Sequence, residues 1–120
     1  MKIAFCYQND MHITGQAGKC TKFMLYDIQD KEIVSKGMVE LEESITFHNV
    51  FHNGTIPFNE HPLSDIDVVI SDSMGAGFVQ KMKRVGITAL MTTETDIEKA
   101  LDAFLSNKLE LVLPEGNSNQ

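Results

Sequence analysis

A glycine-bearing loop is the first feature of this sequence that could hold a ligand. It reads Ser71-Asp72-Ser73-Met74-Gly75-Ala76-Gly77 and follows the short apolar run Asp67 to Ile70. Glycines let backbone amides approach a ligand closely, and the free amides at the start of a helix favour negative charge. The sequence therefore predicts an anion site formed by Ser73, Met74, Gly75, Ala76 and Gly77. The alternative is that these glycines only allow a tight turn from a strand into a helix.

A second loop, from Gln8 to Cys20, combines two glycines with side chains that bind metals. It contains Gly15 and Gly18, and it also carries His12 and Cys20. Imidazole nitrogen and thiolate sulfur are common ligands of transition metals. We expect Gly18 and Cys20 to contact a cofactor, with His12 and Cys20 as the candidate metal ligands. At each histidine the alternative is a structural or solvent-facing side chain.

The remaining histidines and Cys6 suggest no second metal site. His48 and His52 would face the same side only in a helix, and Gly54 and Pro57 argue against a long one. Cys6 lies in an apolar run and is expected in the core. Because the two cysteines form no C-x-x-C motif and a domain of this size needs no covalent staple, we expect reduced thiols.

Catalytic and nucleotide-binding motifs are missing from the sequence. Neither G-x-G-x-x-G nor G-x-x-x-x-G-K-[ST] occurs, and no Ser-His-Asp or Cys-His set is marked by its context. We therefore expect a protein that is not an enzyme.

The hydrophobic pattern predicts an α/β fold with a mixed sheet. Five strands are expected at 1–7, 22–28, 32–41, 67–71 and 87–91, with helices over 78–85 and from Thr95 to about Leu105. Thr95 and Glu98 have the spacing of a capping box, and an irregular segment with a short helix near 59–65 is expected in the middle. In such open sheets, ligands bind at the carboxyl ends of strands where the strand order reverses. Both glycine-bearing loops should meet there if the first and fourth strands are neighbours.

Composition limits the cellular setting and the partners. The chain has 120 residues, is 42% hydrophobic and carries a net charge of −7, which suits one domain and disfavours nucleic acid or an anionic membrane as a partner. We expect a single domain over 1–110 and a flexible tail over 111–120. The first residues lack the pattern of a signal peptide, and no apolar run could span a bilayer, so a cytoplasmic protein is expected.

The chain resembles the dinitrogenase iron-molybdenum cofactor biosynthesis family, whose members bind or carry metal clusters or their precursors. The resemblance covers about residues 1–110. It rests on the opening run Met1 to Phe5, on Phe23 to Ile28, on Asp67 to Ile70 followed by Met74-Gly75, and on Val85-Gly86-Ile87 before the last helix. It implies a ribonuclease H-like three-layer fold with a five-stranded mixed sheet and flanking helices.

The resemblance also implies a function and shows where this chain departs from the family. Gln16 lies where the family usually has a histidine, and Asp72-Ser73 replaces a pair of glycines. We expect a non-catalytic carrier of an iron-molybdenum-type or other metal-sulfur cluster or precursor, exchanging it with a donor or acceptor protein. The alternative is a ribonuclease H-like module that has lost cluster binding and acts through a protein partner or a small anionic ligand.

Overall fold

A six-stranded mixed sheet forms the centre of the molecule in the computed structural model, which describes residues 1–8 and 11–113. Its strands, in chain order, are β1 (Lys2–Cys6), β2 (Lys22–Gln29), β3 (Glu32–Glu40), β4 (Val68–Ser71), β5 (Thr88–Thr92) and β6 (Leu111–Val112). The order across the sheet is β3-β2-β1-β4-β5-β6. The α/β class, the five predicted strands and the neighbouring positions of β1 and β4 are confirmed, and β6 adds a sixth strand.

Strand direction changes at β1. The β1/β2 and β2/β3 pairs are antiparallel, whereas β1/β4 and β4/β5 are parallel. Every residue of β4 is buried, as expected for a β-branched run covered on both faces. β3 lies at the edge and is almost entirely exposed, which agrees with its charged sequence.

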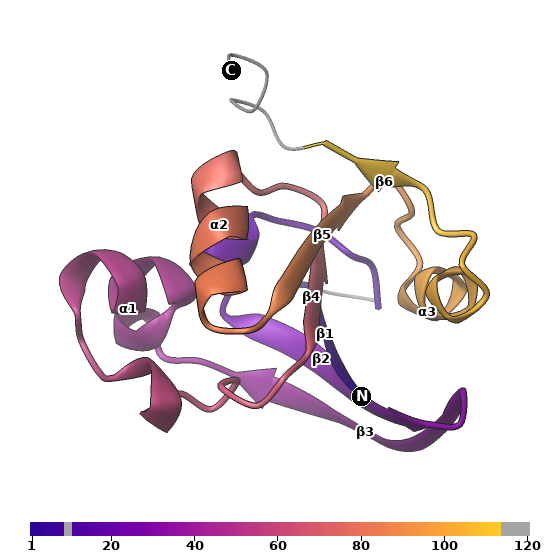
Figure 1. The fold of residues 1–120 in the computed structure, drawn as a ribbon, viewed down its shortest axis with the longest axis horizontal. Coiled ribbons are helices and arrows are strands. Elements are labelled where there is room, and N and C mark those ends of the chain that lie inside the picture. The colour runs from indigo at the N-terminus through magenta and orange to yellow at the C-terminus, as the bar shows by residue number, and fades with distance from the viewer. Residues whose placement is uncertain (9–10, 114–120) are drawn as a thin grey trace.

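Helices cover both faces of the sheet and create two cores. Helices α1 (Phe47–Asn53) and α2 (Ala76–Arg84) lie on one face, and α3 (Ile97–Leu105) lies on the other (Figure 1). The first core contains Phe23, Phe47 and Met82, and the second contains Phe5, Tyr26 and Ile97. The molecule is therefore a three-layer α/β/α sandwich. None of the helices in the described ranges is long and apolar enough to cross a bilayer.

The predicted C-terminal tail needs correction. Leu111 and Val112, assigned to a flexible tail, pair antiparallel with Thr92 and Met91 of β5, because an open sheet edge can accept even a two-residue strand. Leu113 follows β6 and is exposed, and residues 114–120 of the predicted tail lie outside the described residues.

The α3 helix begins one residue later than the sequence pattern indicated. The Asp96 carboxylate, not the Thr95 hydroxyl, accepts a hydrogen bond from the Lys99 amide at 2.9 Å. The Thr95 amide donates to the Glu94 carboxylate at 3.1 Å, and Glu98 instead forms an ion pair with Lys36 of β3 at 3.2 Å. Asp is as good an N-cap as Thr, so the two candidates could not be separated by residue type.

The middle segment holds a helix that was not expected. Thr46 caps α1 by accepting from the Asn49 amide at 3.3 Å, and Gly54 ends it in the left-handed conformation with φ of 61°. The predicted helix near 59–65 is only a 3-10 turn over Phe58–Glu60, followed by turns.

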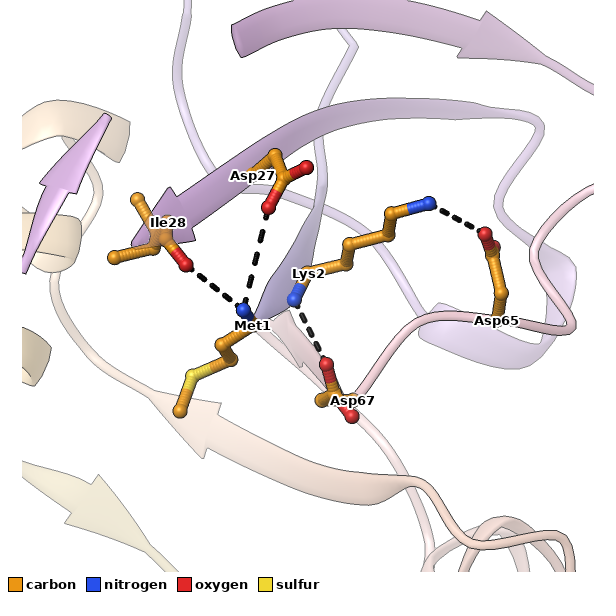
Figure 2. Close-up of polar contacts among 6 residues, drawn as sticks. All are labelled: Met1, Lys2, Asp27, Ile28, Asp65 and Asp67. Atoms are coloured by element: carbon orange, nitrogen blue, oxygen red, sulfur yellow. Dashed lines mark hydrogen bonds and ion pairs between the residues drawn. The ribbon is translucent and has the colours of Figure 1, made fainter. Parts of the chain in front are cut away.

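The amino end of β1 is fixed by polar contacts to two other segments (Figure 2). The Met1 amine donates to the Ile28 carbonyl at 2.8 Å, and the Lys2 amide donates to the Asp67 carboxylate at 2.8 Å. The Lys2 ammonium pairs with Asp65 at 2.6 Å, an interaction that raises the pKa of Lys2 and lowers the pKa of Asp65. Together these contacts hold β1 between β2 and β4.

Candidate functional site

A cleft of about 470 Å³ opens where β1 and β4 end, on the α1/α2 side of the sheet. Its walls come from the 3-10 turn at Ala17–Lys19, from α1 and from the start of α2. The lining residues fall into two groups. The loops contribute Gln16, Gly18, Lys19, Met74, Gly75 and Gly77, and the helices contribute Phe47, His48, Phe51, His52, Phe78 and Lys81. A cleft at the switch in strand order is the expected place for a ligand in such a sheet.

The two glycine-bearing loops meet at this cleft, as the sequence predicted. The Ala17 amide donates to the Ser73 carbonyl at 3.1 Å, and the Ser73 amide donates to the Gly15 carbonyl at 3.2 Å. Gly15 has φ of +88°, a conformation that favours glycine and turns the chain back toward Ser73. The loop contacts are therefore backbone contacts and do not depend on the side chains that depart from the family pattern.

The start of α2 faces the cleft without a capping side chain. Gly75 occupies the N-cap position and gives no side-chain hydrogen bond to the first turn. The amides at the beginning of a nine-residue helix are thus left for solvent or a ligand, and they carry partial positive charge. Lys19 and Lys81 add two cations to the same cleft. This end of the cleft favours an anion.

Two histidines for which the sequence suggested no metal site lie on the cleft wall. His48 and His52 are one helical turn apart in α1, with ring centroids 4.4 Å apart. The His52 Nε2 atom is 3.1 Å from Lys81 Nζ, and the Lys81 charge lowers the pKa of His52. Neutral His52 can accept a hydrogen bond from the Lys81 ammonium. The i, i+4 spacing of His48 and His52 places both on one face of a helix. The sequence could have predicted this only if residues 47–53 had been assigned to a helix.

The predicted site residues are partly brought together. Gly18, Met74, Gly75 and Gly77 line the cleft, and Met74 is buried while still bordering it. Ser73 and Ala76 are each next to a lining residue in the chain but do not line the cleft themselves. His12 is exposed and forms a backbone bridge with Asp96 at the start of α3, away from the cleft.

The prediction of reduced cysteines is wrong for this structure, because Cys6 and Cys20 form a disulfide. Cys20 is only 8% exposed, and Cys6 is fully buried as predicted. Both cysteines line a second pocket of about 480 Å³, which is distinct from the cleft but shares Gln16 and Lys19 with it. As a disulfide, Cys20 has no thiolate to offer to a metal.

Metal-binding side chains are sparse around the cleft. Among residues 1–8 and 11–113, no group of three or more His, Cys, Asp or Glu side chains is placed to hold a metal ion. The cleft offers two imidazoles, one thioether, two ammonium groups and helix amides. Such a donor set fits an anion that already has most of its own ligands better than a bare metal ion.

The sheet order and the cleft together define a small three-layer α/β protein with a cleft at the start of α2. Comparison with known proteins specifies the family. The chain belongs to the dinitrogenase iron-molybdenum cofactor family, whose model matches residues 1–107.

Individual relatives agree with this assignment. The uncharacterized protein MJ0580 of Methanocaldococcus jannaschii is 28% identical over 110 residues, which cover 92% of this chain and 90% of that protein. The crystal structure of PH0822 is similar with a TM-score of 0.72 and 18% identity, covering 92% of this chain and 94% of the other. The crystal structure of MJ0327 from Methanocaldococcus jannaschii has a TM-score of 0.66 and 17% identity, covering 95% and 96%. At these identities, the two structures support the fold alone.

Proposed function

We propose that this protein is a non-catalytic carrier that binds an anionic metal-sulfur cluster, of the iron-molybdenum type or a precursor of it, in the cleft between α1 and α2. The observation that carries the proposal is the uncapped start of α2 facing the same cleft as Lys19 and Lys81. Family membership supplies the class of cargo. The cargo would be exchanged with a donor or acceptor protein.

Local charge supports the binding of an anion even though the whole chain is acidic. The net charge of −7 repels anions at long range, but salt screens this repulsion beyond about 8–10 Å. Within the cleft the lining side chains include two lysines and no carboxylate. Binding is therefore governed by the nearby cations and helix amides, and it weakens as salt concentration rises.

The available donors suggest how the cargo would be held. A cluster with its own sulfide ligands needs charge compensation and hydrogen bonds, which the α2 amides and Lys81 supply. His48 or His52 could contribute one nitrogen ligand to a metal at the edge of the cluster. Gln16 lines the cleft where the family usually has a histidine, so in this chain the α1 histidines would take over that role.

A second candidate function uses the same cleft for a small anion without metal coordination. It is favoured by Gln16, which is a poor metal ligand, and by the disulfide that occupies Cys20. In this case the protein would be a ribonuclease H-like module acting through a small anionic ligand or a protein partner. The strand order β3-β2-β1-β4-β5 supports our assignment of that architecture in either case.

Reconstitution without oxygen tests the first proposal. Protein supplied with iron, molybdate and sulfide should gain a visible charge-transfer band and stoichiometric metal, and its unfolding midpoint should rise on binding. Lys81→Gln should weaken binding about tenfold, because it removes a cation from the cleft. Lys83→Gln changes an exposed lysine of the same helix that does not line the cleft, and it should bind like the wild type.

The outcomes separate the two functions. A colourless protein whose midpoint rises with molybdate alone, in a manner that depends on Lys81, would support the small-anion function. A colourless, metal-free protein with no shift under either condition would refute both uses of the cleft.

A further inference from the structure

Cys6 and Cys20 lie at the two ends of the loop that forms one wall of the cleft. Cys6 is the last residue of β1, and Cys20 follows the 3-10 turn at Ala17–Lys19, with Cα atoms 6.2 Å apart. We propose that this pair is a reversible thiol–disulfide site, reduced and oxidised by small thiols and disulfides, and that its oxidised form fixes the cleft wall.

The second pocket offers a small thiol a path to the cysteine pair. Both cysteines line it, and Lys19 and Lys22 add positive charge. Its volume of about 480 Å³ can admit the reactive end of a small peptide thiol, and the lysines favour one that carries carboxylates. Because Cys20 is 8% exposed and Cys6 is fully buried, Cys20 is the sulfur that an incoming thiolate can reach.

The reduced state is also accommodated by the structure. Cys6 Sγ lies 3.0 Å from the Thr14 carbonyl oxygen, and Cys20 Sγ lies 3.0 Å from the Lys22 carbonyl oxygen. Each thiol formed on reduction can therefore donate a hydrogen bond to a carbonyl already in place, so neither buried S–H group lacks an acceptor. A pair with partners in both states can be interconverted without rearranging the sheet.

Exchange proceeds in two balanced steps. A thiolate attacks Cys20 Sγ, forming a mixed disulfide with Cys20 and releasing Cys6 as a thiolate, which takes up a proton. A second thiolate attacks the sulfur of the small thiol in the mixed disulfide, and Cys20 leaves and is protonated. Overall, one protein disulfide and two small thiols give two protein thiols and one small disulfide. The protons come from the two small thiols.

The oxidation state should affect the loop between the two cysteines. This loop carries Gln16 and Gly18 into the cleft, and its backbone is bonded to Ser73 of the other loop. In the oxidised form both ends are tied together, whereas in the reduced form the wall is held by hydrogen bonds alone. The thiol–disulfide chemistry does not depend on the proposed function, but any effect on cargo binding does.

Thiol trapping in glutathione buffers tests the chemistry on the native wild-type protein. After equilibration at a series of ratios of reduced to oxidised glutathione, free thiols are alkylated and the mass of the protein is measured by mass spectrometry. We expect one transition in which both thiols appear together in a monomer. Three results would overturn the proposal. They are two thiols that titrate independently, a disulfide that is reduced only in denaturant, and thiols that stay free in excess oxidised glutathione.

Single-cysteine variants test the order of attack. Cys6→Ser, which leaves Cys20, should acquire one glutathione at least tenfold faster than Cys20→Ser, which leaves the buried Cys6. Equal rates in two folded variants would contradict the assignment of Cys20 as the accessible sulfur. If either variant fails to fold, alkylation of the reduced wild type, followed by peptide mapping, gives the same comparison.

Hydrogen exchange tests the effect on the loop separately from cargo. The Ala17 amide, which donates to Ser73, should exchange about tenfold faster in the reduced protein through local opening, while the buried amides of β4 should remain much slower than Ala17 in both redox states. Equal exchange at Ala17 in the two redox states would overturn the coupling to the cleft wall. A redox effect on exchange without any cargo binding would refute only the proposed function.

Discussion

Tyr26 has a hydroxyl group that is buried without a hydrogen-bond partner, which is the only such side-chain atom in the described part of the chain. The residue is fully buried in the second core, packs edge-on against Phe5, and has a pKa raised by burial. A buried hydroxyl without a partner destabilises the folded state by about 1–3 kcal/mol. The ring stabilises the folded state through packing, whereas the unpaired hydroxyl destabilises it.

Tyr26→Phe should therefore raise the free energy of unfolding by about 1 kcal/mol, because it removes the unpaired hydroxyl and keeps the ring. Urea denaturation followed by circular dichroism would measure this change. Tyr7→Phe is the matched control, since Tyr7 borders the polar second pocket and should show no gain. A loss of stability in Tyr26→Phe would mean that the hydroxyl has a partner in solution.

His61 makes the folded state sensitive to acid. It is buried and stacks against both Phe47 and Phe58. Its Nδ1 atom accepts from the Leu63 amide at 3.0 Å, and Nε2 can donate to the Ile45 carbonyl at 2.8 Å. Only the neutral ring satisfies both contacts, and burial lowers the pKa of His61. In the unfolded chain His61 takes up its proton near the ordinary pKa of about 6.5.

As pH falls below about 6.5, the unfolded state therefore binds a proton that the folded state resists, and stability decreases. For one proton the slope approaches about 1.4 kcal/mol per pH unit. Denaturation curves between pH 7.5 and 5 should show this dependence in the wild type and in His12→Gln, which changes an exposed histidine. The dependence should be largely lost in His61→Gln, and an unchanged slope in that variant would exclude His61 as its source.

At the scale of elements, α3 depends on a single capping side chain. Asp96→Ala should lower the free energy of unfolding by about 1 kcal/mol, because the Lys99 amide loses its acceptor. Thr95→Ala should have almost no effect, although the sequence pattern pointed to Thr95. Thermal denaturation of the two variants distinguishes them, and an equal loss in both would indicate that they share the cap.

Most of the elements that the sequence predicted carry a clear apolar or alternating pattern. The run Val68 to Ile70 and the stripe of α3 carry enough periodic burial to define a strand and a helix by themselves. The seven-residue α1 helix was missed because Phe47, Val50 and Phe51 form only one helical repeat, and because Gly54 and Pro57 follow closely. With α1 missed, the shared face of His48 and His52 was missed too.

The disulfide and β6 could not be read from local sequence because both depend on the assembled sheet. Cys6 meets Cys20 only after the loop returns to the end of β1, and that return is set by contacts with Ser73. Leu111 and Val112 form a strand only because the β5 edge is open to them. Long-range pairing of this kind leaves no periodic signal in the chain itself.

At the scale of the whole molecule, the disulfide joins two residues 14 positions apart in a chain of 120 residues. Closing a loop of about 15 residues restricts the unfolded chain by about 3 kcal/mol. Domains of this kind are stable by only about 5–15 kcal/mol in total. The redox state of this one pair is therefore expected to change the stability of the entire fold.

Reduction should lower the free energy of unfolding by about 2–3 kcal/mol, which corresponds to a fall in the unfolding midpoint of roughly 10 °C. Parallel urea titrations of the oxidised and reduced wild-type protein would measure the change. The double variant Cys6→Ala, Cys20→Ala is the matched control, because reductant should leave its stability unchanged.

If the wild type were equally insensitive while mass spectrometry showed a complete disulfide, the gain from restricting the unfolded chain would have to be offset by a cost in the folded state. That cost would then be expected in the cleft wall, since the loop between the cysteines forms it.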